Sequence, residues 1–120
     1  MFYQLKLAAV LFCAVFGLFA CSKAKTVRKE YVIAESKAIE ASIFRQNCAI
    51  CHGAEANGKM VSGVQVPSLR YGDAAKRSEE EIYNQIKFGK LPMPGFGKQL
   101  SEEDIQKMVK FVMRDLQGRE

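Results

Sequence analysis

The stretch Cys48-Ala49-Ile50-Cys51-His52 determines how the rest of the chain is interpreted. If these residues turn as a helix, the two thiols lie on one face and can reach two neighbouring vinyl groups on one porphyrin edge. His52, four residues after Cys48, falls on the same side with a ring nitrogen able to bind iron. Cys-x-x-Cys-His is the attachment motif of c-type haem. The sequence therefore predicts one covalently attached haem with His52 as an iron ligand.

Three other interpretations of the two thiols fit the sequence less well. A thioredoxin-like redox pair requires a strand–helix–strand setting, which the flanking residues do not show. A tetrahedral zinc site requires four ligands, but His52 is the only histidine, and Cys13 and Cys21 lie in an apolar N-terminal segment. A disulfide between Cys48 and Cys51 would close a very small loop and add little stability. Haem attachment is therefore the preferred interpretation.

Length and charge limit the class of protein. The chain has 120 residues and a formal net charge of +5, consistent with a single domain. Without the apolar N-terminal segment about a hundred residues remain, which is small for an unaided core, and a buried macrocycle would add apolar interior. The positive charge favours acidic protein partners or anionic surfaces. We do not expect nucleic-acid binding, because no basic run with interleaved aromatic residues occurs.

The N-terminal segment is typical of an export signal. Residues 7–20 are uncharged and mostly apolar, a length that suits a signal peptide better than a membrane span. Their end, Leu18-Phe19-Ala20-Cys21, is similar to the lipobox of bacterial lipoproteins, in which cleavage leaves the cysteine as a lipidated N-terminus. Cleavage after Ser22 by a plain signal peptidase, or an uncut short anchor, are the alternatives.

These features divide the chain into three parts. We expect a signal peptide at 1–21, a polar tether at 22–35 and a folded domain at 36–120. The tether is rich in Lys and Arg and can lie close to anionic headgroups, while Tyr31-Val32-Ile33 is a candidate to pack on the domain. Each interpretation of the leader exports the domain to the periplasmic side of a bacterial membrane.

Helical spacing is visible ahead of the two thiols. Ile39, Ile43 and Phe44 recur at that spacing, which predicts a helix from 36 to about 47. The stretch 53–72 is rich in turn-forming residues and shows no periodicity, so we expect a long loop there.

Two further helices have clear start signals. Ser78 and Ser101 are each followed by three acidic residues, the pattern of a capped helix N-terminus. These caps predict helices over 79–88, ending at Gly89, and over 102–116. The second helix has an apolar stripe with Phe111 beside it: Ile105, Met108, Val109, Val112 and Leu116.

A methionine lies between two prolines in the segment 90–97. Pro92 and Pro94 fix backbone angles and remove hydrogen-bond donors, so we expect a stiff loop outside helix or sheet. Such a loop can hold the thioether of Met93 at a set height over an iron. Met93 is therefore the predicted second axial ligand, with Met60, a vacant position or another ligand as alternatives.

With these features in place, residues 39–116 resemble the class I monohaem cytochromes c. Residues 48–52 are similar to the family's attachment motif, and residues 86–96 to its distal-ligand pattern. The resemblance implies an all-α fold, with about four short helices wrapped around one covalent haem c. It implies His52 as the proximal and Met93 as the distal iron ligand.

The resemblance also assigns residues around the haem. Pro67-Ser68-Leu69 is similar to the segment whose proline carbonyl accepts a hydrogen bond from the ligating histidine, which fixes the tautomer of His52. Pro67, Leu69 and Phe96 are the implied haem-pocket residues.

A second implied contact lies where the first and last helices cross. Phe44 and Phe111 are similar to the aromatic pair that the family places at this crossing. Glu40 stands where the family often has glycine, and the neighbouring Ala41 is the candidate for the close contact.

The function that the resemblance implies is outer-sphere electron transfer without enzymatic activity, because two protein ligands leave no iron position for a substrate. The first hypothesis is a monomeric carrier, periplasmic or membrane-tethered through lipid on Cys21. Its redox partners would have acidic surfaces for Lys59, Lys87, Lys90 and Lys98. The alternative is a haem c subunit of a larger periplasmic oxidoreductase complex. A third possibility, a sensor or peroxidase, requires Met93 to leave the iron.

Overall fold

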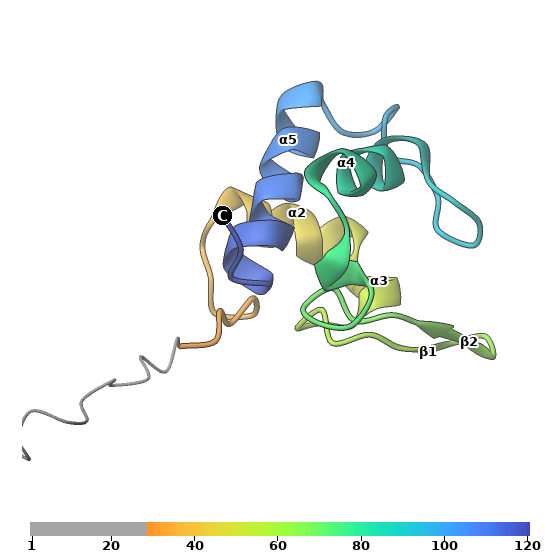
Figure 1. The fold of residues 1–120 in the computed structure, drawn as a ribbon, viewed down its shortest axis with the longest axis horizontal. Helices are drawn as coiled ribbons and strands as arrows, with labels where there is room; N and C mark the ends of the chain where they lie inside the picture. The colour runs from red at the N-terminus through yellow and green to blue at the C-terminus, as the bar shows by residue number, and fades with distance from the viewer. Residues whose placement is uncertain (1–28) are drawn as a thin grey trace, which may run out of the picture.

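The computed structural model describes residues 29–120, which form a mainly helical fold (Figure 1). The predicted leader and its Cys21 lie outside the described residues. In chain order the elements are α2 (Ile39–Asn47), α3 (Ala49–His52), β1 (Lys59–Val61), β2 (Val64–Val66), a 3-10 turn (Ala74–Lys76), α4 (Glu79–Phe88), α5 (Glu102–Lys110) and a π-helical turn (Phe111–Leu116). No helix within residues 29–120 is long and apolar enough to cross a membrane.

The core is organised by the crossing of α2 with α5 and its π-helical extension (Figure 1). Phe44 and Phe111 are buried, with ring centroids 6.2 Å apart and ring planes inclined by 50°. Ala41 is also fully buried in this core, where its small side chain allows a close approach. The predicted aromatic pair is therefore confirmed. The predicted stripe of the last helix is buried as well: Ile105, Met108, Val109, Val112 and Leu116.

The serine caps form as the sequence predicts. The Ser78 hydroxyl accepts a hydrogen bond from the Glu81 amide at 3.2 Å, and the Glu81 carboxylate accepts one from the Ser78 amide at 2.7 Å. The Ser101 hydroxyl accepts from the Asp104 amide at 3.1 Å. Each bond satisfies a donor that a helix start leaves unpaired, so α4 and α5 begin at fixed positions.

Residues 30–36, here called the strap, fold back onto the helical core. Ile33 is fully buried, and the Tyr31 ring meets Phe111 edge to face with centroids 5.4 Å apart. Val32 points outward and is 39% exposed. Packing of the apolar run at 31–33 is therefore confirmed for its first and third residues.

Two local predictions were wrong. The stretch 53–72 is not wholly irregular, because β1 and β2 pair as an antiparallel hairpin that projects from the helices (Figure 1). Ser62 and Gly63 turn the hairpin with positive φ angles of 47° and 81°, a conformation that tight hairpin turns require. Ile39, predicted on the apolar face of its helix, is 62% exposed, and α2 begins at this residue rather than at Ser36.

Candidate functional site

The two thiols and the histidine lie on one short helical turn. The Cys48 amide ends α2 by donating to the Phe44 carbonyl at 2.8 Å. The Cys48 carbonyl then accepts from the amides of Cys51 at 3.1 Å and His52 at 2.9 Å. Both thiols are half-buried and form no disulfide within residues 29–120. The helical turn on which the motif argument depends is therefore present.

The His52 ring is buried and has a defined tautomer. Its exposed fraction is 7%, and its Nδ1 lies 3.1 Å from the Pro67 carbonyl oxygen. Because a carbonyl only accepts, Nδ1 carries the proton and Nε2 keeps its free lone pair. Burial lowers the pKa of His52 below its usual value, although the Pro67 bond acts in the opposite direction. At neutral pH the ring is therefore uncharged and its Nε2 can bind a metal.

Gly58 brings the Pro67 segment onto the histidine. Its amide donates to the His52 carbonyl at 2.8 Å, and its φ is +78°. A Cβ at this position would lie 2.5 Å from the Val66 carbonyl oxygen and 2.7 Å from the Ser68 nitrogen. Only glycine allows this approach, so the His52–Pro67 bond depends on it.

Burial keeps the Cys48 side chain protonated. Burial raises the pKa of Cys48 to about 11, and the nearby Cys51 adds to this effect. A raised thiol pKa keeps the thiolate fraction low at neutral pH, so the local environment does not activate Cys48 as a nucleophile.

The loop that carries Met93 is fastened to the end of α4. The Phe96 amide donates to the Ile86 carbonyl at 2.8 Å, and the Gly97 amide donates to the Lys87 carbonyl at 3.0 Å. Within the loop, the backbones of Lys90 and Met93 exchange two hydrogen bonds of 3.0 Å. The loop therefore has little freedom to shift, as its prolines predict.

Close backbone packing fixes the same loop further. A Cβ on Gly95 would lie 2.5 Å from the Phe88 carbonyl carbon, and a Cβ on Gly89 would lie 2.5 Å from the Gly95 nitrogen. The half-buried Met93 sulfur accepts a hydrogen bond from Gln85 Nε2 at 3.4 Å. Nothing in the sequence indicated Gln85, because this contact exists only once the loop has folded back on α4.

The remaining predicted residues take several positions. Phe96 is buried at 8% exposure and Leu69 is half-buried. Pro67 has an exposed ring and contributes its carbonyl to His52. Met60, the alternative ligand, is 62% exposed on the hairpin. In Figure 1, α3 and the loop after α4 lie on the same side of α5.

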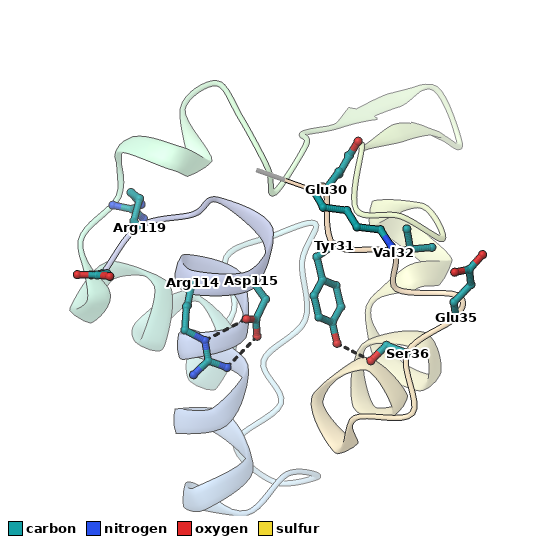
Figure 2. Close-up of a pocket in the computed structure, with 10 residues that line it drawn as sticks. Glu30, Tyr31, Val32, Glu35, Ser36, Arg114, Asp115 and Arg119 are labelled. Carbon is teal, nitrogen blue, oxygen red and sulfur yellow. Dashed lines mark hydrogen bonds and ion pairs between the residues drawn. The ribbon is translucent and has the colours of Figure 1, made fainter. Parts of the chain in front are cut away.

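A hollow of about 470 Å³ lies elsewhere, between the strap and the C-terminal turn (Figure 2). Its side chains pair among themselves: Tyr31 bonds Ser36, and Arg114 bonds Asp115. None of the predicted site residues lines it. We therefore locate the candidate site at α3 and the Met93 loop.

A match to a known protein family identifies the class of cofactor. A family model described as "Cytochrome C oxidase, cbb3-type, subunit III" matches residues 37–112. The chain belongs to this family of c-type cytochromes. One covalently attached haem c is therefore its cofactor, and the free thiols at 48 and 51 stand in the attachment position.

Individual proteins similar to this chain are also cytochromes of the c type. Cytochrome c6 of Gracilaria tenuistipitata var. liui is 37% identical over 71 residues, covering 59% of this chain and 65% of that protein. Cytochrome c6 of Microcystis aeruginosa is 38% identical over 78 residues, covering 61% of this chain and 89% of that protein. The solved structure of the c-type cytochrome KustC0563 gives a TM-score of 0.51 at 25% identity, covering 66% of this chain and 95% of that chain. The predicted cytochrome c fold is confirmed.

The side chains available in this c-type cytochrome fit a covalently attached haem. Two unpaired thiols, a buried neutral imidazole with one free nitrogen, and a thioether on a fastened loop are what covalent haem attachment and iron ligation require. Its family membership makes the protein an electron carrier through a c-type haem, not an enzyme.

Proposed function

We propose that this protein is an exported monohaem electron carrier with His/Met ligation. In this proposal Cys48 and Cys51 hold the haem by thioether bonds, and His52 and Met93 bind the iron. The observation that carries the proposal is the His52 ring, since its Nδ1 is occupied by Pro67 and its Nε2 is left as the free donor. The haem supplies a one-electron Fe(III)/Fe(II) couple when bound.

The chain's own residues would keep the reorganisation energy of electron exchange low. The Pro67 carbonyl holds His52 in one tautomer, and the fastened loop holds Met93 at one height. Fixed ligands need little rearrangement when iron changes its charge. Phe96 is buried, and we propose that apolar side chains such as this one would keep water from the haem.

Charge supports a tethered form. Cleavage before Cys21 would remove Lys6 with the leader. Residues 21–28 would then contribute three basic side chains and no acidic one, whereas residues 29–120 have a net charge of only +1. Most of the excess charge thus lies beside the proposed lipid site at Cys21, where it would meet anionic headgroups. We propose a lipid anchor on the periplasmic side on this basis.

The near-neutral domain would recognise redox partners through local charges. Lys59, Lys90 and Lys98 are exposed, whereas Lys87 is paired with Glu102 at 3.0 Å. We propose that acidic partner surfaces meet the three exposed lysines, and that the carrier is a monomer. The alternative, a haem c subunit of a larger periplasmic oxidoreductase, is favoured by the family description, which names an oxidase subunit.

The test is production in an exporting host with haem-attachment machinery. Intact mass would report one haem and any lipid, and the optical spectrum would report the ligands. A carrier should purify as a monomer with salt-sensitive electron exchange, whereas a subunit should co-purify with its complex. Colourless exported protein would contradict the proposal.

A further inference from the structure

A buried arginine joins three separate segments next to the histidine. The side chain of Arg70 is 6% exposed. Its Nε donates to the Glu55 carbonyl at 2.5 Å and its Nη2 to the Tyr31 carbonyl at 2.7 Å. Its guanidinium also pairs with the carboxylates of Glu55 at 3.3 Å and Glu30 at 3.4 Å. The planar fork of arginine can satisfy all these acceptors at once, which a lysine cannot.

Glu55 completes the connection from the opposite side. Its two carboxylate oxygens accept the backbone amides of Ile33 at 2.8 Å and Ala34 at 2.9 Å. The Glu55–Arg70 pair is called the clamp below. It ties the strap to the loop that follows His52 and to the loop that follows Pro67.

The clamp continues directly to the Pro67 segment. The Arg70 amide donates to the Ser68 hydroxyl at 3.1 Å, and that hydroxyl donates to the Ala56 carbonyl at 3.3 Å. The Leu69 amide donates to the same Ala56 carbonyl at 2.9 Å. Residues 55–56 and 68–70 are therefore joined by hydrogen bonds, and Pro67 directly precedes the second of these segments.

We infer that Glu55 and Arg70 are positioning residues for the bond between His52 Nδ1 and the Pro67 carbonyl. The packed strap supplies hydrogen-bond partners to both side chains. This inference rests on the proposed function, in which His52 binds the iron. A well-aligned bond makes the imidazole a stronger donor and stabilises the ferric state. Loosening the clamp therefore raises the reduction potential.

The experiment compares Arg70→Leu and Glu55→Gln with the wild-type holoprotein and with Ser101→Ala. Ser101 caps α5 from an exposed position, so its loss reduces stability without touching the His52 loops. Three quantities are measured: the reduction potential, the denaturant midpoint, and exchange of the His52 Nδ1 proton by NMR.

For Arg70→Leu we expect about a tenfold change in relative ferric affinity, which is about 59 mV upward for one electron. Nδ1 proton exchange should accelerate as well. Glu55→Gln keeps one acceptor oxygen and should shift both quantities less, in the same direction. Ser101→Ala should lower only the midpoint.

Unchanged potentials and proton exchange, with midpoints lowered as in Ser101→Ala, would show that the clamp is merely structural and overturn the inference. If Arg70→Leu does not mature, Arg70→Lys keeps the charge but loses the fork, and the same criteria apply to it and to Glu55→Gln. Failure of the proposed function would be seen separately, as a wild-type spectrum without His/Met ligation.

Discussion

The amide nitrogen Nε2 of Gln85 lies 3.4 Å from the sulfur of Met93 and donates a hydrogen bond to it. Arg77 orients this amide, because its Nη1 donates to Gln85 Oε1 at 3.0 Å. The donated bond draws electron density from the sulfur lone pairs. It would weaken Met93 as a donor to ferric iron and so favour the reduced state.

Replacing Gln85 should therefore lower the reduction potential. A hydrogen bond of about 1 kcal/mol corresponds to a shift on the order of 40 mV for one electron. Gln85→Ala is compared with Asn84→Ala, an exposed neighbour on the same helix, by redox titration of the holoprotein. An equal potential in the two variants, or a rise in Gln85→Ala, would contradict this role.

Gly58→Ala should destabilise the fold more than Gly63→Ala does. Both glycines have positive φ, +78° and +81°, so an alanine costs about 1 kcal/mol at either position from backbone strain. Only at Gly58 would the Cβ also meet backbone atoms, at 2.5 Å, whereas nothing lies within 4 Å at Gly63. Guanidinium denaturation of the two holoproteins measures the difference, and equal losses would refute the close-approach argument.

Acid should weaken the fold through His52. Burial lowers its folded pKa below the usual 6.5, so the unfolded chain takes up a proton at a higher pH than the folded chain. The free energy of unfolding should thus fall as pH drops below about 6.5, and iron ligation acts in the same direction.

Denaturant midpoints at several pH values between 7.5 and 5 test this dependence. The carboxylates with lowered pKa values, such as Glu81, titrate below about 4.5 and do not enter this window. A denaturant midpoint that is constant down to pH 5 would contradict the predicted loss of stability through protonation of His52.

The sequence was informative wherever signals were local. The serine caps predicted the starts of α4 and α5, and the thiol spacing predicted the helical turn at 48–52. Burial of Phe44 and Phe111 followed from helical periodicity and the family resemblance.

Contacts between distant segments could not be predicted. The bond from Arg70 to the Tyr31 carbonyl joins residues 39 positions apart, and Gln85 meets Met93 only because the loop folds back on α4. The hairpin, by contrast, had a local signal, the Ser62-Gly63 pair between two valines. It was missed because other Gly and Asn residues in the same stretch made the whole segment look like an irregular loop.

The most direct test of the central claim compares Met93→Ala with Met60→Ala in the ferric holoprotein. The measurement is the weak near-infrared or red-edge absorption band of a sulfur–iron bond, followed by carbon monoxide binding to the reduced form at neutral pH. We predict the band in wild type and Met60→Ala but not in Met93→Ala, which alone should bind carbon monoxide rapidly. A band that survives in Met93→Ala, or wild-type protein that binds the gas rapidly at rest, would contradict iron held by His52 and Met93.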